Sequence, residues 1–424
     1  MLQVAVIREE KDRLVAAFTK RRLKNIEETL TRVVELDDQR KNIQQTQESA
    51  QSEGNSLAKE IGSLMKAGKK EEAEVMKKRT AELKEQASAA GEKLSQIEEE
   101  LKQLLYTIPN APQADVPEGV SAEENVVAYE HGDIPTLPED ALPHWDLIKK
   151  YDIIDFDLGN KIAGAGFPVY KGKGAKLQRA LINFFLDEAE KQGYKEMQPP
   201  IVVNEASGYG TGQLPDKEGQ MYFIQEDNLY LIPTAEVPIT NLYRDVIVPT
   251  EELPIKNTGY TPCFRREAGS WGAHVRGLNR LHQFDKVEIV HICKPEDSNA
   301  AHETMMAYVQ TLLEKLELPY RRLLLCGGDM SFSAAKCYDM EVFSAAQKRW
   351  LEVSSISNFE TYQANRLKLR YKNDEGKTQL LHTLNGSALA LPRIVACILE
   401  NNQTPDGIKI PEILVPYTKF DWIS

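Results

Sequence analysis

A short charged run, Phe-Arg-Arg-Glu at residues 264–267, contains side chains well suited to binding a phosphorylated ligand. If this run is a strand, alternation places Arg265 and Glu267 on the same face. A guanidinium in that position can bind phosphate oxygens, and the carboxylate can accept hydrogen bonds from an amino group. The pattern indicates a binding surface, although an exposed hairpin with ordinary ion pairs would have the same sequence.

A second run, His-Gln-Phe-Asp-Lys-Val-Glu at residues 282–288, follows a glycine-containing segment. Strand alternation sends Phe284 and Glu288 to one face. The flat ring can stack on a base, and the carboxylate can accept from an amino or hydroxyl group. Together the two runs offer a surface for a phosphate, a base and a small polar group.

A turn bracketed by prolines supplies further polar side chains. Pro233 and Pro238 enclose Thr234, Ala235 and Glu236. Because proline fixes its own φ angle, such a turn holds its threonine and glutamate in defined positions. A surface turn with an ordinary carboxylate is the alternative interpretation.

The segment Glu352-Val353-Ser354-Ser355 is predicted to lie on a strand. Alternation puts Glu352 and Ser354 on one face, where a carboxylate and a hydroxyl could hold a magnesium ion and phosphates. An edge strand with outward polar residues would have the same sequence.

The segment from His382 to Ser387 is predicted to lead into a helix over residues 387–401. Ser387 at the helix start is first of all a capping candidate, and a lone His382 is more often structural than catalytic. Arg393 follows within the same helix, and a solvent-exposed helix cation is the alternative to a functional role.

The N-terminal quarter has the periodicity of two long helices. Apolar residues recur in alternating steps of three and four over residues 73–104 and at seven-residue intervals from Leu36 to Leu64, with a turn signal at 66–70. This pattern predicts an antiparallel helical hairpin, a coiled coil over about residues 27–105. A coil that dimerises with another chain is the alternative.

The remaining residues predict an α+β domain. Strand-like runs outnumber helical stretches and do not alternate with them, so the sheet should be mostly antiparallel and flanked by helices. The strand-like runs are 194–203, 221–232, 260–267, 281–291, 321–326, 338–344, 350–356 and 366–372, and the helical stretches are 177–191, 296–317 and 387–401. No GxGxxG or GxxxxGK[ST] sequence is present, which argues against a Rossmann fold and a P-loop.

Composition narrows the class of protein. A chain of 424 residues is expected to form two domains. The net charge is −12, yet residues 1–105 hold 20 basic and 20 acidic residues, so an anionic partner could contact that part. Five scattered cysteines without a CxxC favour a reducing cytoplasm, and no zinc is expected. Neither a signal peptide nor a membrane span is expected.

Taken in order, these segments resemble the seryl-tRNA synthetases of the bacterial type, which are class II aminoacyl-tRNA synthetases. The resemblance covers nearly the whole chain, from Met1 through the hairpin and every polar segment above to Asn401. It implies a tRNA-binding domain at 1–108 that carries the coiled-coil arm, and a catalytic domain at 109–424. The segment that ends in Pro200 is similar to motif 1 of this class, which implies a homodimer.

The resemblance also implies a reaction and a set of site residues. ATP and L-serine would form seryl-adenylate, and serine would pass to tRNA(Ser), with tRNA(Sec) as a further candidate. The residues implied for ATP binding are Arg265, Arg266, Glu267, Phe284, Glu352, Val353, Ser354, Ser355 and Arg393. Arg265 and Arg393 are the implied catalytic residues, and Glu352 and Ser355 are the implied ligands of Mg²⁺ with ATP. The residues implied for serine binding are Thr234, Ala235, Glu236, Glu288, Thr383 and Ser387.

Within these sets the resemblance gives individual roles. Arg265 corresponds to the ligand of the α-phosphate and Glu267 to that of the adenine amino group, while Phe284 and Arg393 enclose the adenine. Glu236 corresponds to the carboxylate that takes the serine ammonium. Glu288 and Thr383 correspond to the groups that meet the serine hydroxyl.

Three positions depart from the family pattern: Arg266 replaces a small residue, the loop 270–275 is atypical, and Pro392 stands where glycine often precedes the motif-3 arginine. Arg266 is expected to face away from the site, and the acceptor-end contacts of the loop stay open. Two rival hypotheses are a paralogue that loads a carrier protein, which should lack the hairpin, and a non-catalytic scaffold, which should have lost the site residues.

Overall fold

A computed structural model describes residues 1–216, 218–267 and 276–424. The chain forms two compact units, one of Met1–Phe18 with Leu23–Pro109 and one of Thr19–Arg22 with Asn110–Ser424. The loop at 270–275, for which acceptor-end contacts were considered, lies outside the described residues.

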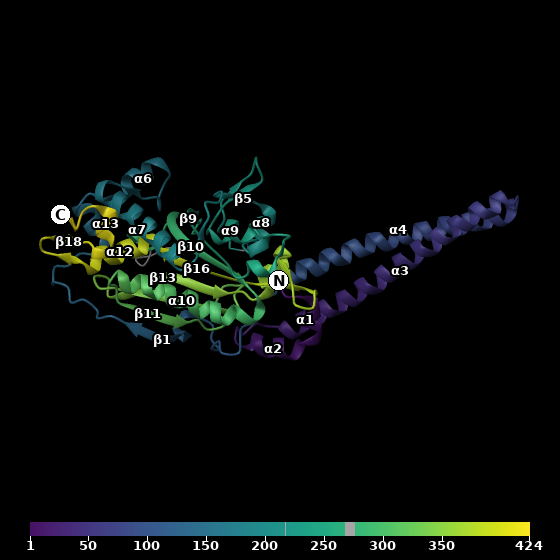
Figure 1. The fold of residues 1–424 in the computed structure, drawn as a ribbon, viewed down its shortest axis with the longest axis horizontal. Coiled ribbons are helices and arrows are strands. Elements are labelled where there is room, and N and C mark those ends of the chain that lie inside the picture. Colours follow the sequence, from purple (N-terminus) through teal and green to yellow (C-terminus); the bar gives the residue numbers. More distant parts are fainter. Residues whose placement is uncertain (217, 268–275) are drawn as a thin grey trace. The chain divides into compact units, whose positions relative to one another are not determined.

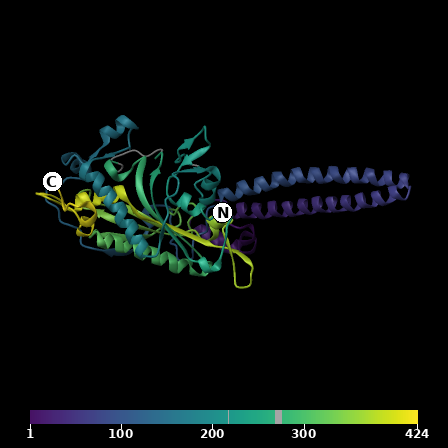
Figure 2. The ribbon, with the colours of Figure 1, turned by 45° about the horizontal axis from the view of Figure 1, so that its top comes forward.

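The first unit is dominated by two long antiparallel helices that lie side by side (Figures 1 and 2). Its helices are α1, Val4–Glu9; α2, Lys11–Thr19; α3, Ile26–Lys66; and α4, Lys70–Thr107. Ala50 and Leu57 of α3 form an apolar cluster with Leu83 and Ala87 of α4. The seam predicted for residues 73–104 therefore packs on the same chain, and the predicted hairpin is confirmed.

The polar middle of α3 is accommodated by a glycine on α4. A Cβ built on Gly91 would lie 2.7 Å from Nε2 of Gln47, so the glycine leaves room for this amide in its present position. The two helices thus stay side by side at this point, although the apolar contacts between them are interrupted there.

A buried carboxylate near the start of α3 is surrounded by cations of its own unit. Oδ2 of Asp37 lies 2.9 Å from Nη2 of Arg8 and 2.8 Å from Nζ of Lys41, and Oδ1 lies 2.9 Å from Nη2 of Arg40. Burial alone would raise the pKa of Asp37, but the hydrogen bonds from these three cations lower it to about 2.

The second unit is built on an eight-stranded sheet in the order β1-β11-β12-β13-β16-β10-β9-β4. The strands are β1, Val126–His131; β4, Lys195–Glu196; β9, Ile255–Phe264; β10, Gln283–Cys293; β11, Tyr320–Leu324; β12, Lys336–Ser344; β13, Arg349–Asn358; and β16, His382–Ala390. All neighbouring pairs are antiparallel except β4 with β9. The predicted α+β class with a mostly antiparallel sheet is confirmed.

Helices cover both faces of this sheet (Figure 2). The main core lies on one face, under α7, Gly172–Lys191; α10, Ser298–Lys315; and α12, Leu391–Asn401. On the other face Ile239 of α9, Glu236–Asn241, and Leu367 of α11, Thr361–Leu367, pack with Val290 and Ile292 of β10. Apolar residues on both faces of β10 explain why its sequence shows little hydrophobic alternation.

The other elements are short. The strands are β2, Ile154–Asp155; β3, Val169–Tyr170; β5, Val202–Asn204; β6, Phe223–Ile224; β7, Leu229–Leu231; β8, Ile247–Val248; β14, Arg370–Lys372; β15, Thr378–Leu380; β17, Gln403–Thr404; β18, Gly407–Lys409; and β19, Trp422–Ile423. The helices are α5, His144–Lys150; α6, Phe156–Ile162; α8, Glu205–Thr211; α13, Val415–Thr418; and the 3-10 turns η1, Ala122–Glu124; η2, Thr250–Glu252; η4, Gly277–Asn279; η5, Pro295–Asp297; and η6, Glu412–Leu414.

Several predicted boundaries are wrong. Residues 387–390 belong to β16, not to a helix, because the pairing with β10 continues through Ser387 to Ala390. The helix begins at Leu391, and Pro392 lies in its first turn, where a missing N–H removes no helical bond. The strand predicted at 260–267 ends at Phe264, and the run 366–372 begins in α11.

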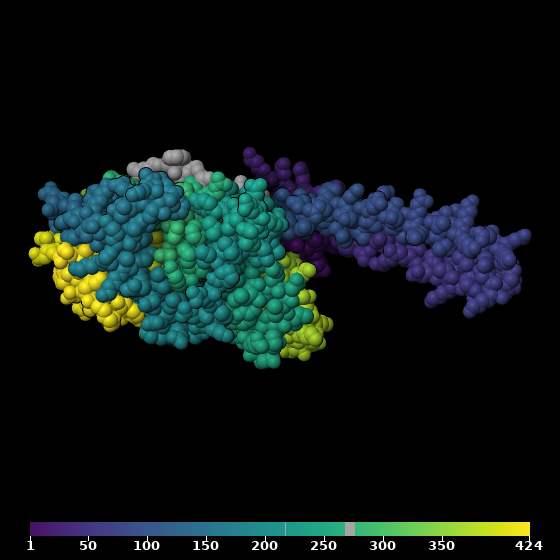
Figure 3. Space-filling view, turned by 90° about the horizontal axis from the view of Figure 1, so that it is seen from above, coloured from purple at the N-terminus to yellow at the C-terminus, as the bar shows by residue number. Residues whose placement is uncertain are grey.

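The C-terminal residues lie on the surface beside α7 (Figure 3). Nζ of Lys173 donates to the carbonyl oxygen of Trp422 at 2.8 Å and lies 5.5 Å from the centre of the Phe420 ring. In the described part of the chain, none of the helices combines the length and hydrophobicity that a bilayer crossing requires.

Candidate active site

Two adjacent strands present most of the predicted serine-binding side chains on one face. Leu384 of β16 belongs to the main core, so alternation turns Thr383, Asn385 and Ser387 to the opposite face. Glu288 of β10 pairs with Ser387. The pairing of β10 with β9 runs from Gln283 to Ile292 without a shift, so the predicted alternation along β10 holds.

A lysine on β10 joins the cluster, and sequence reasoning did not single it out. Nζ of Lys286 lies 2.5 Å from Oε2 of Glu288 and donates to Oγ1 of Thr234 at 2.8 Å. Oγ1 of Thr234 in turn donates to Oε2 of Glu288 at 3.2 Å. The side chains of Lys286 and Glu288 are 7% and 2% exposed. One oxygen of the carboxylate is thereby occupied by protein groups.

A second buried carboxylate, Glu236, is connected to β16 by a glutamine. Nε2 of Gln363, on α11, donates to Oε1 of Glu236 at 2.6 Å, and Oγ1 of Thr383 donates to Oε1 of Gln363 at 2.7 Å. Ala235 caps α9 directly before Glu236 and is fully buried. The turn predicted to hold Glu236 rigidly is thus the start of a helix.

The negative charges of Glu236 and Glu288 are only partly neutralised by cations of the described residues. Burial, and then the negative charge of Glu288, raise the pKa of Glu236 from 4.5 to about 7, although Gln363 and Lys286 act in the opposite direction. Among the residues that the structure describes, Lys286 is the one cation in ion-pair contact with this pair of carboxylates. The arrangement is suited to a small ligand that brings an ammonium group.

Arg265 lies over the ring that was predicted to stack on a base. The centre of its guanidinium is 5.3 Å from the centre of the Phe284 ring, and its Nε donates to the carbonyl oxygen of Pro233 at 3.3 Å. A cation held over a half-buried ring can interact with both a phosphate and a base.

Glu267 reaches its position by a route that strand alternation does not describe. The strand has ended, Glu267 has a φ of 49°, and its carboxylate forms an ion pair with Arg280. Arg266 is exposed, and its backbone N–H donates to the carbonyl oxygen of Gln220 at 2.8 Å. The prediction that Arg265 and Glu267 share a face assumed that the strand continues to residue 267, but the strand ends at Phe264.

A bulge in β13 corrects the predicted pairing of Glu352 with Ser354. Leu351, Val353 and Ile356 all lie in the main core, so one residue between the last two is extra. Glu352 and Ser355 consequently share the opposite face. The hydroxyl of Ser354 is buried and donates to the carbonyl oxygen of Ser387 at 2.6 Å.

The donor set at this bulge fits a hard cation. Glu352 and Ser355 present the carboxylate and hydroxyl oxygens that Mg²⁺ binds, and Asp339 of β12 pairs with Ser355. Burial, followed by the charge of Glu352, raises the pKa of Asp339 well above its ordinary value. A cation between these two carboxylates would relieve their repulsion.

Arg393 connects α12 to the same region. Its Nη1 donates to the carbonyl oxygen of Glu352 at 2.6 Å and lies 3.5 Å from Oε2 of Glu352, and its Nε donates to the carbonyl oxygen of Asn279 at 3.1 Å. Arg393 is therefore held by two backbone carbonyls and a carboxylate, and its functional role stays a prediction.

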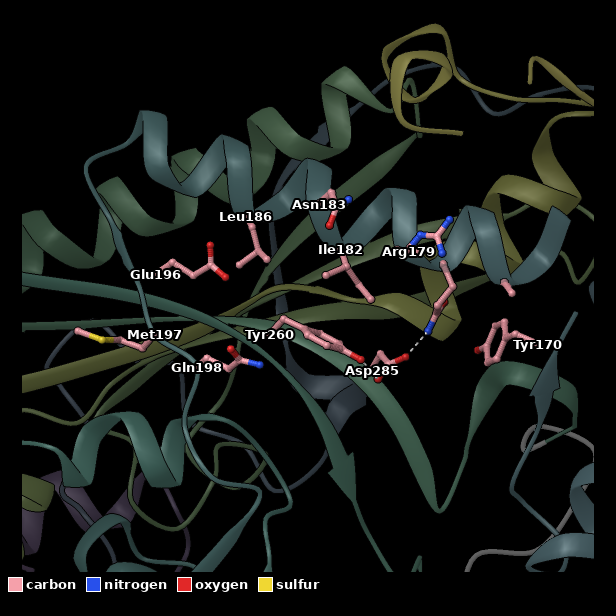
Figure 4. Close-up of a pocket in the computed structure, with 12 residues that line it drawn as sticks. Tyr170, Arg179, Ile182, Asn183, Leu186, Glu196, Met197, Gln198, Tyr260 and Asp285 are labelled. Atoms are coloured by element: carbon pink, nitrogen blue, oxygen red, sulfur yellow. Dashed lines mark hydrogen bonds between the residues drawn. The ribbon is translucent and has the colours of Figure 1, made fainter. Parts of the chain in front are cut away.

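A separate pocket of about 550 Å³ lies on the other face of β10, between α7 and the strands β9 and β4. Figure 4 shows Asp285 and Tyr260 opposite the α7 residues Ile182 and Leu186. Asp285 accepts hydrogen bonds from Tyr260 at 3.0 Å and from Gln178 at 2.9 Å. None of the predicted site residues lines it.

The chain is similar to known proteins over nearly its whole length. Residues 1–112 match the seryl-tRNA synthetase N-terminal domain, and residues 222–402 match the tRNA synthetase class II core domain (G, H, P, S and T). A serine–tRNA ligase of Salinibacter ruber is 50% identical over 92% of this chain and 91% of its own length. That of Chlorobium chlorochromatii is 46% identical over 99% of both chains.

The chain belongs to the serine–tRNA ligase family. It is therefore an ATP-dependent aminoacyl-tRNA ligase of class II, and the resemblance inferred from the sequence is confirmed. The fold is also similar to the crystal structure of seryl-tRNA synthetase from Pyrococcus horikoshii complexed with ATP, with a TM-score of 0.92 and 30% identity over 100% of this chain and 99% of the other. The roles of individual residues stay predictions.

Three residues in contact with the predicted site residues were missed in the sequence. Lys286 lies between Phe284 and Glu288 on the same strand face, so the alternation that identified those two could also have found it. Gln363 and Asp339 left no such signal, because their neighbours come from distant segments.

Proposed function

We propose that this chain activates L-serine with ATP to seryl-adenylate and transfers the seryl group to the 3′ end of tRNA(Ser). The observation that carries the proposal is the buried group of Glu236, Glu288 and Lys286, which lacks one positive charge. A serine ammonium supplies that charge, and its hydroxyl can reach Glu288 and Thr383. Arg265, which lies over the ring of Phe284, suits the α-phosphate, and the ring suits the adenine.

In the first step a carboxylate oxygen of serine attacks the α-phosphorus of ATP, and the bond to pyrophosphate breaks. The nucleophile is already ionised, so the protein needs to place it in line and to stabilise charge on the phosphoryl oxygens. Arg265 would supply that charge. Magnesium, held by Glu352 and Ser355, would supply positive charge to the phosphates when ATP is bound.

The remaining ATP contacts follow from the same surface. Glu267 would accept from the adenine amino group, and Arg393 would enclose the base together with Phe284. In the second step the terminal ribose hydroxyl of tRNA attacks the seryl carbonyl carbon and AMP leaves. A phosphate oxygen of the adenylate would take the hydroxyl proton, so no general base from the protein is required.

The direct test is ATP–pyrophosphate exchange with serine, alanine and threonine. We expect exchange with serine alone, followed by charging of purified tRNA(Ser); charging of tRNA(Sec) is measured in parallel. Exchange without charging of any tRNA would favour a protein that loads a carrier. Absence of exchange would favour a scaffold.

The hairpin of α3 and α4 is proposed to bind tRNA, because it belongs to the N-terminal residues 1–105, which hold 20 basic and 20 acidic residues, while the rest of the chain is acidic. Deleting residues 29–101 and joining the ends with a short glycine linker should spare serine activation and remove tRNA charging. Full charging by the deletion variant would contradict this role.

A homodimer is proposed through the surface around the pocket behind β10. This surface includes β4, an edge strand that precedes Pro200, and the α7 residues Ile182 and Leu186. Leu186→Glu should convert a dimer into a monomer in sedimentation experiments, and a monomeric wild type would overturn the proposal. Five free, buried cysteines fit an enzyme of the reducing cytoplasm.

A further inference from the structure

A fully buried histidine–glutamate pair lies outside the residues to which the proposed function gives a role. His144, the first residue of α5, and Glu400, near the end of α12, are both 0% exposed at their side chains, and Nδ1 of His144 lies 2.6 Å from Oε1 of Glu400. Glu400 also accepts from the backbone N–H of His144 at 2.8 Å, from Nε2 of Gln347 at 2.9 Å and from the hydroxyl of Ser344. A carboxylate has acceptor sites for all four donors.

The second nitrogen of His144 holds the η4 turn. Nε2 of His144 accepts a hydrogen bond from the backbone N–H of Leu278 at 2.8 Å. Nε2 must therefore be unprotonated, so the ring proton is on Nδ1 and points to Glu400. Gly277 has a φ of 66°, and a Cβ on it would lie 2.3 Å from Nε2 of His144. The ring and the turn fit only because this position lacks a side chain.

The η4 turn is in direct contact with groups proposed to bind ATP. The carbonyl oxygen of Asn279 accepts from Nε of Arg393, whose Nη1 contacts Glu352. Arg280, the next residue, forms the ion pair with Glu267. A shift of this turn would move Arg393 and Glu267 together, while no hydrogen bond from it reaches Glu236 or Glu288 in the described residues.

We propose that His144 is a positioning residue for the ATP side of the site. Glu400 fixes its tautomer, the acceptor Nε2 fixes the η4 turn, and the turn fixes Arg393 and Glu267. This inference rests on the proposed function, since it takes the ATP roles of those two residues from it. It predicts a defect in ATP binding that leaves serine binding unchanged.

Two substitutions separate the functions of the two ring nitrogens. His144→Asn places an amide donor near Nδ1 and has no acceptor for Leu278, whereas His144→Gln can place an amide oxygen near Nε2. In ATP–pyrophosphate exchange we expect the KM for ATP to rise about tenfold in His144→Asn and about twofold in His144→Gln, as the loss of one oriented hydrogen bond predicts. The KM for serine should change less than twofold in both.

Ser344→Ala is the matched control, because Ser344 contacts Glu400 but not the η4 turn. It should lower the unfolding temperature without changing the KM for ATP. If His144→Asn does not fold, Gly277→Ala displaces the turn from the other side and should raise the KM for ATP selectively. An unchanged KM for ATP in the folded variant, or equal increases for ATP and serine, would overturn the role of His144. Serine-dependent exchange by the wild type would then still support the proposed function.

Discussion

Two buried carboxylates, one in the helical hairpin unit and one in the sheet unit, have opposite electrostatic surroundings. Asp37 is paired with Arg8, Arg40 and Lys41, and its pKa is lowered to about 2. Glu236 accepts from the neutral amide of Gln363 and has Glu288 nearby, and its pKa is raised to about 7. The first carboxylate is satisfied by its own unit, and the second is not.

The difference separates a structural charge from a functional one. Above its unfolded pKa, ionised Asp37 stabilises the folded state. Ionised Glu236 destabilises it, because the pKa of this carboxyl is higher in the folded state than in the unfolded state. The stability of the folded state therefore falls as the pH rises from 4.5 to 7. A buried carboxylate that lowers the stability of the fold is retained where a ligand supplies the positive charge that it lacks. The serine ammonium is the ligand that the proposed function provides.

The largest expected effect is that of replacing Glu288, the second buried carboxylate of the candidate site. Glu288→Ala should reduce the preference for serine over alanine, which a pocket built around a hydroxyl sets at about 10⁴–10⁵. The measurement is exchange activity with both amino acids, with Glu288→Gln as the conservative control. If the alanine variant kept the wild-type ratio, Glu288 would not be the hydroxyl reader.

Arg265→Ala should lower the rate of adenylate formation by about 10²–10³, because one donor to the developing phosphoryl charge is lost. Its unfolding temperature should stay close to that of the wild type. Arg370→Ala on β14 is a matched arginine control outside the site. Near-normal exchange in a well-folded Arg265→Ala protein would refute the assignment.

Asp37→Asn should destabilise the folded state by about 2 kcal/mol at pH 7, the equivalent of its lowered pKa. The difference from the wild type should shrink below pH 4 and become small near pH 2, where the carboxyl is protonated in the unfolded state and about half protonated in the folded state. Denaturant unfolding over this pH range measures it. An undiminished difference at pH 2 would show that the three ion pairs are not its origin.

The smallest effect is a pH dependence of serine binding. Because ionised Glu236 is the form that pairs with an ammonium, the KM for serine should rise about tenfold from pH 8 to pH 6. The KM for ATP serves as the internal reference in the same exchange assay. A KM for serine that is flat over this range would separate Glu236 from the ammonium.

The sequence predicts the hairpin and the antiparallel sheet because both depend on local periodicity, as the seam around Leu83 shows. It fails at β16, where pairing with β10 extends the strand through residues 387–390, for which a helix was predicted. It also fails at Ser354, since one extra residue in β13 reverses which side chains face the site. Bulges and long-range partners such as Gln363 leave no periodic signal in the chain.

Glu236→Gln removes the buried negative charge that we assign to serine binding. Serine-dependent exchange should fall by at least about 10² in this variant. Its folded state should be more stable than that of the wild type at pH 8, by up to about 3 kcal/mol, with the gain lost below pH 4.5. Denaturant unfolding and exchange on the same preparation give both values. A variant that is inactive but no more stable, or one that still activates serine, would show that Glu236 is not an unpaired carboxylate completed by serine.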